Sequence, residues 1–211
     1  GVDLWRYGPR EPDPDLSESL MCRDKFVVGY VGTHGMAHGL ENVLKAADLL
    51  RDRKDIMFLF VGSGSARPGL ISDAKSYGLE NVIFMASQPK QRIPAVWSQC
   101  EAALVHLRNL SVFRDVIPSK MFEAMGMGLP IILTIPKGEA SAILEKIGAG
   151  VHVLPDDPLE LAKVIIQLAD DSEMCQTLGN NSLLAAPYHT REIQAAHMIS
   201  VLEAVKTGKS G

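Results

Sequence analysis

Glu123 is the residue of this sequence best suited to chemistry. It lies in the run 121–127, whose other members are all apolar or glycine, so the helix predicted there is apolar on nearly every side. A buried glutamate needs a partner. A capping box would place the acid three residues after Ser119, but that position is Phe122. We therefore predict that a polar ligand supplies the missing partner of Glu123.

The start of the same helix is suited to binding an anion. The backbone N–H groups after Pro118 precede the first helical turn and would attract phosphate groups. Ser119 and Lys120 add a hydroxyl and an ammonium group at this point. Asp115 stands eight residues before Glu123, in a loop where no helical periodicity fixes its direction, and taken alone it reads as a turn acid.

The elements around this stretch alternate between strands and helices. Buried strands are expected at 26–31, 56–61, 82–85, 102–106, 130–133 and 151–153. Helices are expected between them, near 40–50, 68–77, 92–99 and 140–146 besides the Glu123 helix. Most connections are too long for hairpins, so the strands must be parallel, with helices on both faces. The fold class is α/β, a doubly wound, Rossmann-like six-stranded sheet followed by three trailing helices near 158–169, 172–184 and 191–205.

The chain divides into three parts by composition. Residues 1–24 are rich in proline and charge and are read as a lead-in or linker segment. Residues 25–206 carry the alternating elements and are read as the domain itself. Residues 207–211 are polar and are expected to be frayed.

Topology selects the same site independently of any motif. In the usual strand order 3-2-1-4-5-6, the order reverses between strands one and four, and ligands bind outside their carboxyl ends. The loops at those ends are 32–39 and 107–118, and the second leads directly into the Glu123 helix. The misplaced carboxylate and the topological rule therefore indicate one crevice.

Small-residue turns are expected to line this crevice. Gly32, Thr33 and His38 belong to the first loop, whose glycine spacing is not the dinucleotide fingerprint G-x-G-x-x-G. Ser63 and Ser87 lie in turns that follow the second and third strands. Each turn alone could be an ordinary loop, but together they could hold a nucleoside, because backbone groups and short polar side chains often read bases.

Composition excludes several classes of function. A net charge of -4 gives no general attraction for nucleic acid. No apolar run is long enough to span a membrane, and the first residues do not resemble a signal peptide. Three widely spaced cysteines and six scattered histidines form neither a disulfide framework nor a metal motif. A reduced, cytoplasmic protein without a metal is predicted.

Six stretches in order resemble one known family. They are 29–32 (GYVG), 60–64 (FVGSG), 118–125 (PSKMFEAM), 128–131 (GLPI), 148–151 (GAGV) and 157–162 (DPLELA). The chain is similar to the nucleotide-sugar-binding, C-terminal half of retaining glycosyltransferases of the GT-B fold, in the group 1 or family 4 class. The resemblance covers essentially the whole chain.

The resemblance implies roles for individual residues. Asp115 and Glu123 match the pair of acids eight residues apart that serves the donor; Glu123 would bind the ribose hydroxyls and Asp115 would contact the sugar. The backbone of Met121 and Phe122 would face the diphosphate. The family's first acid is usually Glu, and its first loop commonly carries Arg and Lys where this chain has Thr33 and His38.

The resemblance also implies partners. The donor would be a UDP- or GDP-sugar, bound without a cofactor or metal. The acceptor, a saccharide or lipid-linked saccharide, would bind an N-terminal lobe that this chain lacks. In the full-length protein the enzyme could lie at the inner face of the membrane. The run 118–120 together with 138–140 resembles branches that build bacterial surface polysaccharides.

Two other functions remain open at this level. A nucleotide-sugar epimerase could use the same fold, although it need not carry the acid pair at this spacing. A non-catalytic nucleotide-binding module would keep the crevice without turnover.

Overall fold

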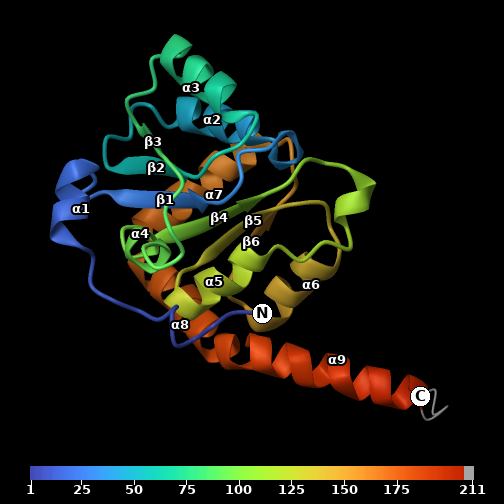
Figure 1. The fold of residues 1–211 in the computed structure, drawn as a ribbon. Helices are drawn as coiled ribbons and strands as arrows, with labels where there is room; N and C mark the ends of the chain where they lie inside the picture. Colours follow the sequence, from blue (N-terminus) through green and yellow to red (C-terminus); the bar gives the residue numbers. More distant parts are fainter. Residues whose placement is uncertain (207–211) are drawn as a thin grey trace.

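Six apolar runs form the central sheet of the computed structural model, which describes residues 1–206 (Figure 1). All neighbouring strands are parallel, in the order β3-β2-β1-β4-β5-β6. The doubly wound class and the strand order are therefore confirmed. The strands are β1 (Phe26–Val31), β2 (Ile56–Val61), β3 (Val82–Met85), β4 (Ala102–His106), β5 (Ile131–Thr134) and β6 (Gly150–Val153).

Helices cover both faces of this sheet because its inner strands are apolar on both sides. One face packs against α2 (Leu40–Leu49), α3 (Arg67–Ser76) and α7 (Pro158–Asp170). The other face packs against α4 (Ile93–Trp97), α5 (Ser119–Met127), α6 (Glu139–Ile147) and α8 (Ser172–Ala185). Two hydrophobic cores result, one on each side of the strands.

Most element boundaries match the predictions within a residue or two. The fifth strand begins at Ile131 rather than Pro130, whose ring nitrogen carries no proton for a ladder hydrogen bond. Short 3₁₀ turns also occur at η1 (Met36–His38), η2 (Ser111–Phe113) and η3 (Ala186–His189). They tighten connections for which the sequence indicated only loops.

The lead-in segment packs onto this body. Helix α1 (Pro14–Ser19), which the sequence did not predict, is capped by Asp13, whose side chain accepts hydrogen bonds from two backbone N–H groups. Val2, Tyr7 and Leu20 are buried in the hydrophobic core beside α5. These side chains anchor residues 1–24 against the sheet's helical layer.

Helix α9 (Arg191–Lys206) runs away from the body (Figure 1). None of its residues is buried, and five large apolar side chains are exposed: Met198, Ile199, Val201, Leu202 and Val205. The predicted fraying of 207–211 falls outside the described residues. Among the described residues, no helix is both long and apolar enough to cross a membrane.

Two glycines let the loops after β1 and β2 lie against each other. Gly62 has φ of +147°, and a Cβ atom there would sit 1.9 Å from the carbonyl oxygen of Gly32. The loops are also joined by hydrogen bonds, in which the N–H of Gly32 donates to Val61 at 2.9 Å and that of His34 donates to Ser63 at 2.8 Å. This contact fixes the backbone at the carboxyl edge of the sheet.

We expect Gly62→Ala to lower the free energy of unfolding by about 2 kcal/mol or more, because the new Cβ clashes with backbone and φ is strained. The matched control is Gly69→Ala in α3, where a Cβ meets nothing within 4 Å. It should raise stability by up to about 1 kcal/mol. Urea denaturation measures both, and equal stabilities of the two variants would contradict the expectation.

Candidate functional site

A cavity of about 460 Å³ opens at the predicted crevice, outside the carboxyl end of β1 and beside the start of α5. Its walls come from the lead-in segment, the loop after β1, the loop before α4, and the starts of α5 and α9. The lining residues are Asp3, Arg6, Tyr7, Val31, Gly32, Thr33, Lys90, Ile93, Ser119, Lys120, Glu123 and Arg191. Of the predicted site residues, Gly32, Thr33, Ser119, Lys120 and Glu123 therefore meet in one place.

Lys120 carries a buried ammonium group at this cavity. Its Nζ atom has no hydrogen-bond partner among the described residues and lies 3.9 Å from the centroid of the Tyr30 ring. Gly32 makes room for it, because a Cβ atom at Gly32 would lie 2.8 Å from Nζ. Burial lowers the pKa of Lys120 from 10.5 to about 7, against the opposing effect of the Glu123 charge. An anion in the cavity would give this group its missing partner.

Glu123 has protein partners, so the prediction that only a ligand would partner it is wrong. The indole Nε1 of Trp97 donates a hydrogen bond to the carboxylate at 3.4 Å. The hydroxyl of Tyr7, which lines the same cavity, also favours the charged form of the carboxylate. Burial raises the pKa of Glu123, and the two donors and the Lys120 charge act against that rise. Trp97 and Tyr7 are both distant from Glu123 in sequence, so the residues around Glu123 gave no sign of them.

A second cavity of about 230 Å³ continues from the first and shares Gly32, Thr33 and their neighbours. Ser63 and Ser87 line it as predicted, and their hydroxyl oxygens lie 3.1 Å apart. Gln88 also lines it, with its amide nitrogen donating to the carbonyl of Ala86 at 3.1 Å. This leaves the Gln88 side-chain oxygen as an acceptor beside a pocket walled by small groups.

Four predicted site residues line neither cavity. His38 is half-buried with Nδ1 3.3 Å from the carbonyl oxygen of His106, and burial and then the Lys120 charge lower its pKa. Met121 is fully buried, and Phe122 stacks on His189 with ring centroids 5.0 Å apart. Their side chains face the core. The role predicted for their backbone, to face the diphosphate, stays a prediction.

Asp115 is exposed in the loop between η2 and α5. The preceding residue is pinned to the start of α6, since the carbonyl of Arg114 accepts a hydrogen bond from the N–H of Glu139 at 3.0 Å. Gly138 permits this approach, because a Cβ atom there would lie 2.1 Å from the same oxygen. The loop thus holds Asp115 beside the N-terminus of α6 and outside both cavities.

Sequence reasoning missed the residues that come from the two ends of the described chain. Asp3, Arg6 and Tyr7 reach the cavity from the lead-in, and Arg191 reaches it from the start of α9. The cationic lining groups are Arg6, Lys90, Lys120 and Arg191, against the carboxylates of Asp3 and Glu123. No spacing relates these residues, so no sequence signal could have grouped them. Their charges make the lining positive, which favours an anionic ligand.

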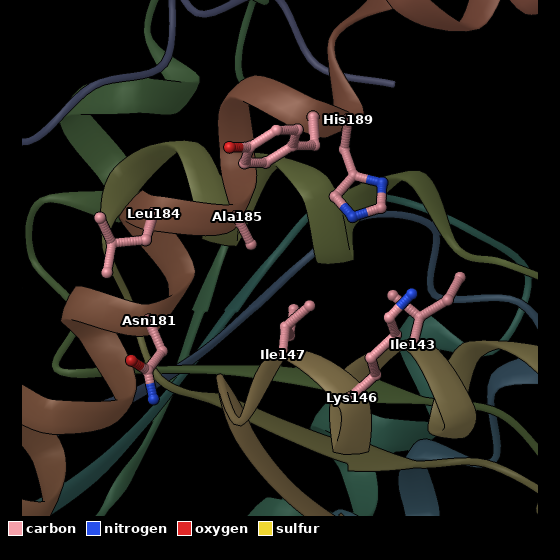
Figure 2. Close-up of a pocket in the computed structure, with 8 residues that line it drawn as sticks. Ile143, Lys146, Ile147, Asn181, Leu184, Ala185 and His189 are labelled. Carbon is pink, nitrogen blue, oxygen red and sulfur yellow. The ribbon is translucent and has the colours of Figure 1, made fainter.

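A third cavity, of about 540 Å³, lies away from the crevice, between α6 and the α8–η3 segment (Figure 2). Figure 2 shows Ile143 and Ile147 on one side and Leu184 and Ala185 on the other. Its volume exceeds that of the crevice cavity, but it lacks a buried unpaired charge. We therefore place the functional site at the crevice. Among the described residues, no group of three His, Cys, Asp or Glu side chains could hold a metal ion.

The family model of the glycosyl transferases group 1 matches residues 16–184. This chain belongs to the group 1 glycosyltransferases. It is similar to a protein described as a probable glycosyltransferase, WbjE of Pseudomonas aeruginosa, with 29% identity over 167 residues that cover 77% of this chain and 40% of that one. This group 1 glycosyltransferase chain thus spans less than half the length of that relative.

Solved structures share the fold of this group 1 glycosyltransferase. The C-terminal domain of a group 1 family protein (LpcC) from Francisella tularensis superposes with a TM-score of 0.74 and 20% identity, covering 90% of this chain and 98% of that domain. Anabaena HepE, solved in complex with UDP-glucose, gives a TM-score of 0.80 and 21% identity over 97% of this chain and 56% of HepE. The predicted glycosyltransferase architecture is confirmed.

We expect Lys120→Met to stabilise the fold at low pH. Between pH about 7 and 10.5 the unfolded chain holds a proton that the folded chain has lost, so stability rises with pH across this window. Below pH 7 Lys120 is charged in both the folded and the unfolded chain, so its burial lowers the free energy of unfolding by the full amount. The variant should therefore exceed wild type by on the order of 2 kcal/mol at pH 6, with the gap closing towards pH 10.5.

Denaturant titration at pH 6, 8 and 10 measures this difference. The control is Lys54→Met, whose side chain is 72% exposed and whose replacement should change stability by less than about 0.5 kcal/mol at each pH. A Lys120→Met variant less stable than wild type at pH 6 would show that the ammonium group already has a stabilising partner.

Proposed function

We propose that this chain is the donor-binding lobe of a glycosyltransferase and that its crevice binds a nucleoside-diphosphate sugar. The observation that carries the proposal is the buried Lys120 ammonium group, which has no hydrogen-bond partner within residues 1–206 and lies one helical turn from Glu123. A buried cation without a counter-ion costs the fold free energy. A diphosphate in the cavity would pair with the ammonium group, and the relief of its unfavourable burial would add to the free energy of binding.

The start of α5 supports a phosphate at the same point. Its N-cap is Pro118, and no side chain caps the first turn, so the Ser119 hydroxyl and the helix dipole remain free to act on an anion. The backbone of Met121 and Phe122 would add to this positive end. The first loop contributes the backbone of Gly32 and Thr33. His38, held against His106, leaves Lys120 as the cation closest to the cavity floor.

The remaining parts of a donor have matching surroundings. Glu123 would accept hydrogen bonds from the ribose hydroxyls, since a carboxylate with two donors bound retains acceptor capacity. The base would occupy the cavity of Ser63, Ser87 and Gln88, where hydroxyl and amide groups can read its edge. Asp115 would contact the transferred sugar once the donor and the second lobe are in place.

Catalysis would need a second, N-terminal lobe that binds a saccharide or lipid-linked saccharide acceptor. The length of the chain relative to WbjE and the exposed apolar residues of α9 support such a partner. Transfer would proceed with retention of configuration and without a metal, with the cations of the crevice stabilising the leaving diphosphate. The similarity to WcaI of Escherichia coli, a putative colanic acid biosynthesis glycosyl transferase, supports a role in bacterial surface polysaccharide synthesis.

We expect one nucleoside diphosphate to stabilise this chain. At about 100 times Kd, a ligand adds roughly 2.7 kcal/mol, which should raise the unfolding midpoint by roughly 5–10 °C. A thermal-unfolding screen against UDP, GDP, ADP, TDP and CDP measures this, with Lys120→Met as the variant that should lose the shift. The absence of a shift with every diphosphate, in this chain and in the full-length protein, would refute the proposal.

We expect Glu123→Ala to keep the fold and to weaken nucleotide binding about tenfold or more. The change removes the ribose acceptor, while the stability loss should stay within about 1–3 kcal/mol because only the Trp97 and Tyr7 donors lose a partner. Calorimetric titration with the diphosphate measures affinity. Glu80→Ala, with a side chain 89% exposed, is the control. If Glu123→Ala unfolds and wild type ignores nucleotides, Glu123 is structural.

A further inference from the structure

Tyr7 reaches the crevice from a tight turn in the lead-in segment. The N–H groups of Arg6 and Tyr7 both donate to the carbonyl of Asp3, at 2.9 and 3.0 Å. The Tyr7 side chain is 7% exposed and belongs to the hydrophobic core, although it also lines the cavity. An aromatic ring that is buried while its hydroxyl faces a cavity is suited to holding a polar group there.

Gly126 brings this turn directly onto α5. A Cβ atom at Gly126 would lie 3.0 Å from the Cβ of Tyr7 and 3.3 Å from its carbonyl oxygen. Gly126 is three residues after Glu123, so both lie on the same face of the helix. The turn therefore packs against the face of α5 that carries Glu123, and Tyr7 and Glu123 line the same cavity.

The Tyr7 side chain lines the same cavity as Glu123, and hydrogen bonding by its hydroxyl favours the charged form of the Glu123 carboxylate. Burial, and then the charge of Glu123, raise the pKa of Tyr7 to about 12, so the phenol stays a donor at neutral pH. Trp97 donates from α4 to Oε2 of the same carboxylate at 3.4 Å. Two donors from separate elements thus fix the carboxylate and leave acceptor sites that face the cavity.

The turn itself is clamped to the start of α9. The N–H of Val2 donates to His189 at 2.9 Å, and the N–H of Arg191 donates back to Val2 at 3.1 Å. An ion pair joins Asp3 and Arg191 at 3.1 Å beside the cavity. The position of Tyr7 therefore depends on two segments that meet at the mouth of the site.

We propose that Tyr7 is a positioning residue that holds Glu123 in the orientation needed to bind the ribose hydroxyls of the donor. The proposal rests on the proposed function of the crevice, and it adds the clamped 3–7 turn to the donor site. Tyr7 itself need not touch the ligand; it acts through the carboxylate.

The test compares Tyr7→Phe with wild type. This change removes only the hydroxyl and leaves the ring that packs against Gly126. UDP and GDP are each titrated alongside their 2′,3′-dideoxy analogues by calorimetry. The variant should bind the ribonucleotide about tenfold more weakly, and the dideoxy analogue within about twofold of wild type. Tyr77→Phe, on an exposed ring at the end of α3, is the control that should change neither.

A second measurement needs no ligand. The pKa of Glu123 is followed by carbon-13 NMR of its carboxyl group in both proteins. Loss of the Tyr7 donor should raise that pKa, since the donor favours the charged form. The inference about Tyr7 is wrong if Tyr7→Phe leaves the pKa of Glu123 unchanged, or if it weakens binding of the ribonucleotide and the dideoxy analogue equally. Either result leaves the proposed function standing. If the wild-type protein binds no nucleotide, the proposed function is wrong. The pKa measurement needs no ligand, so it still tests the contact between Tyr7 and Glu123 in that case.

Discussion

The burial of one lysine ammonium group at the carboxyl edge of the sheet is the constraint on which the rest of the site depends. Lys120 Nζ lies over the Tyr30 ring with no hydrogen-bond partner among residues 1–206, and burial lowers its pKa to about 7 although the Glu123 charge opposes that shift. The arrangement is possible because Gly32 has no side chain and because both faces of the sheet are covered by helices that exclude water. Such a group lowers the free energy of unfolding, and a bound anion would offset that loss.

The same helix turn joins this cation to a carboxylate that the protein has already oriented. Glu123 lies three residues after Lys120, accepts a hydrogen bond from Trp97, and is favoured in its charged form by the Tyr7 hydroxyl. A ligand that carries both an anionic group and a diol could satisfy both residues at once, whereas a simple anion would satisfy only Lys120. A ligand of that kind would therefore gain more from these two residues than inorganic phosphate would.

The sequence was sufficient for the sheet and insufficient for the walls of the site. Continuous apolar runs such as Phe26–Val31 indicate strands buried on both faces, and long crossovers allow only parallel pairing, so the strands followed from the sequence and their order from the usual topology of the class. Glu123 followed from its misfit with an apolar helix, and Lys120 followed from its place at the start of that helix. Tyr7 and Arg191 did not, because their roles arise from a β-bridge between Val2 and Thr190 that no local periodicity encodes. The partners of Glu123 were missed for the same reason.

The loop after β1 differs from the family pattern in the position of positively charged side chains. Where relatives of the resembled family commonly carry cations, this chain has Thr33 and His38, and the structure turns His38 towards the carbonyl of His106. His34 is fully buried among aromatic rings, and burial lowers its pKa to about 4, so the loop offers no charge at neutral pH. Lys120 enters the space beside Gly32 instead. Lys120 therefore stands in the first turn of a helix, a more rigid support than a loop, where its charge adds to the positive end of the helix dipole.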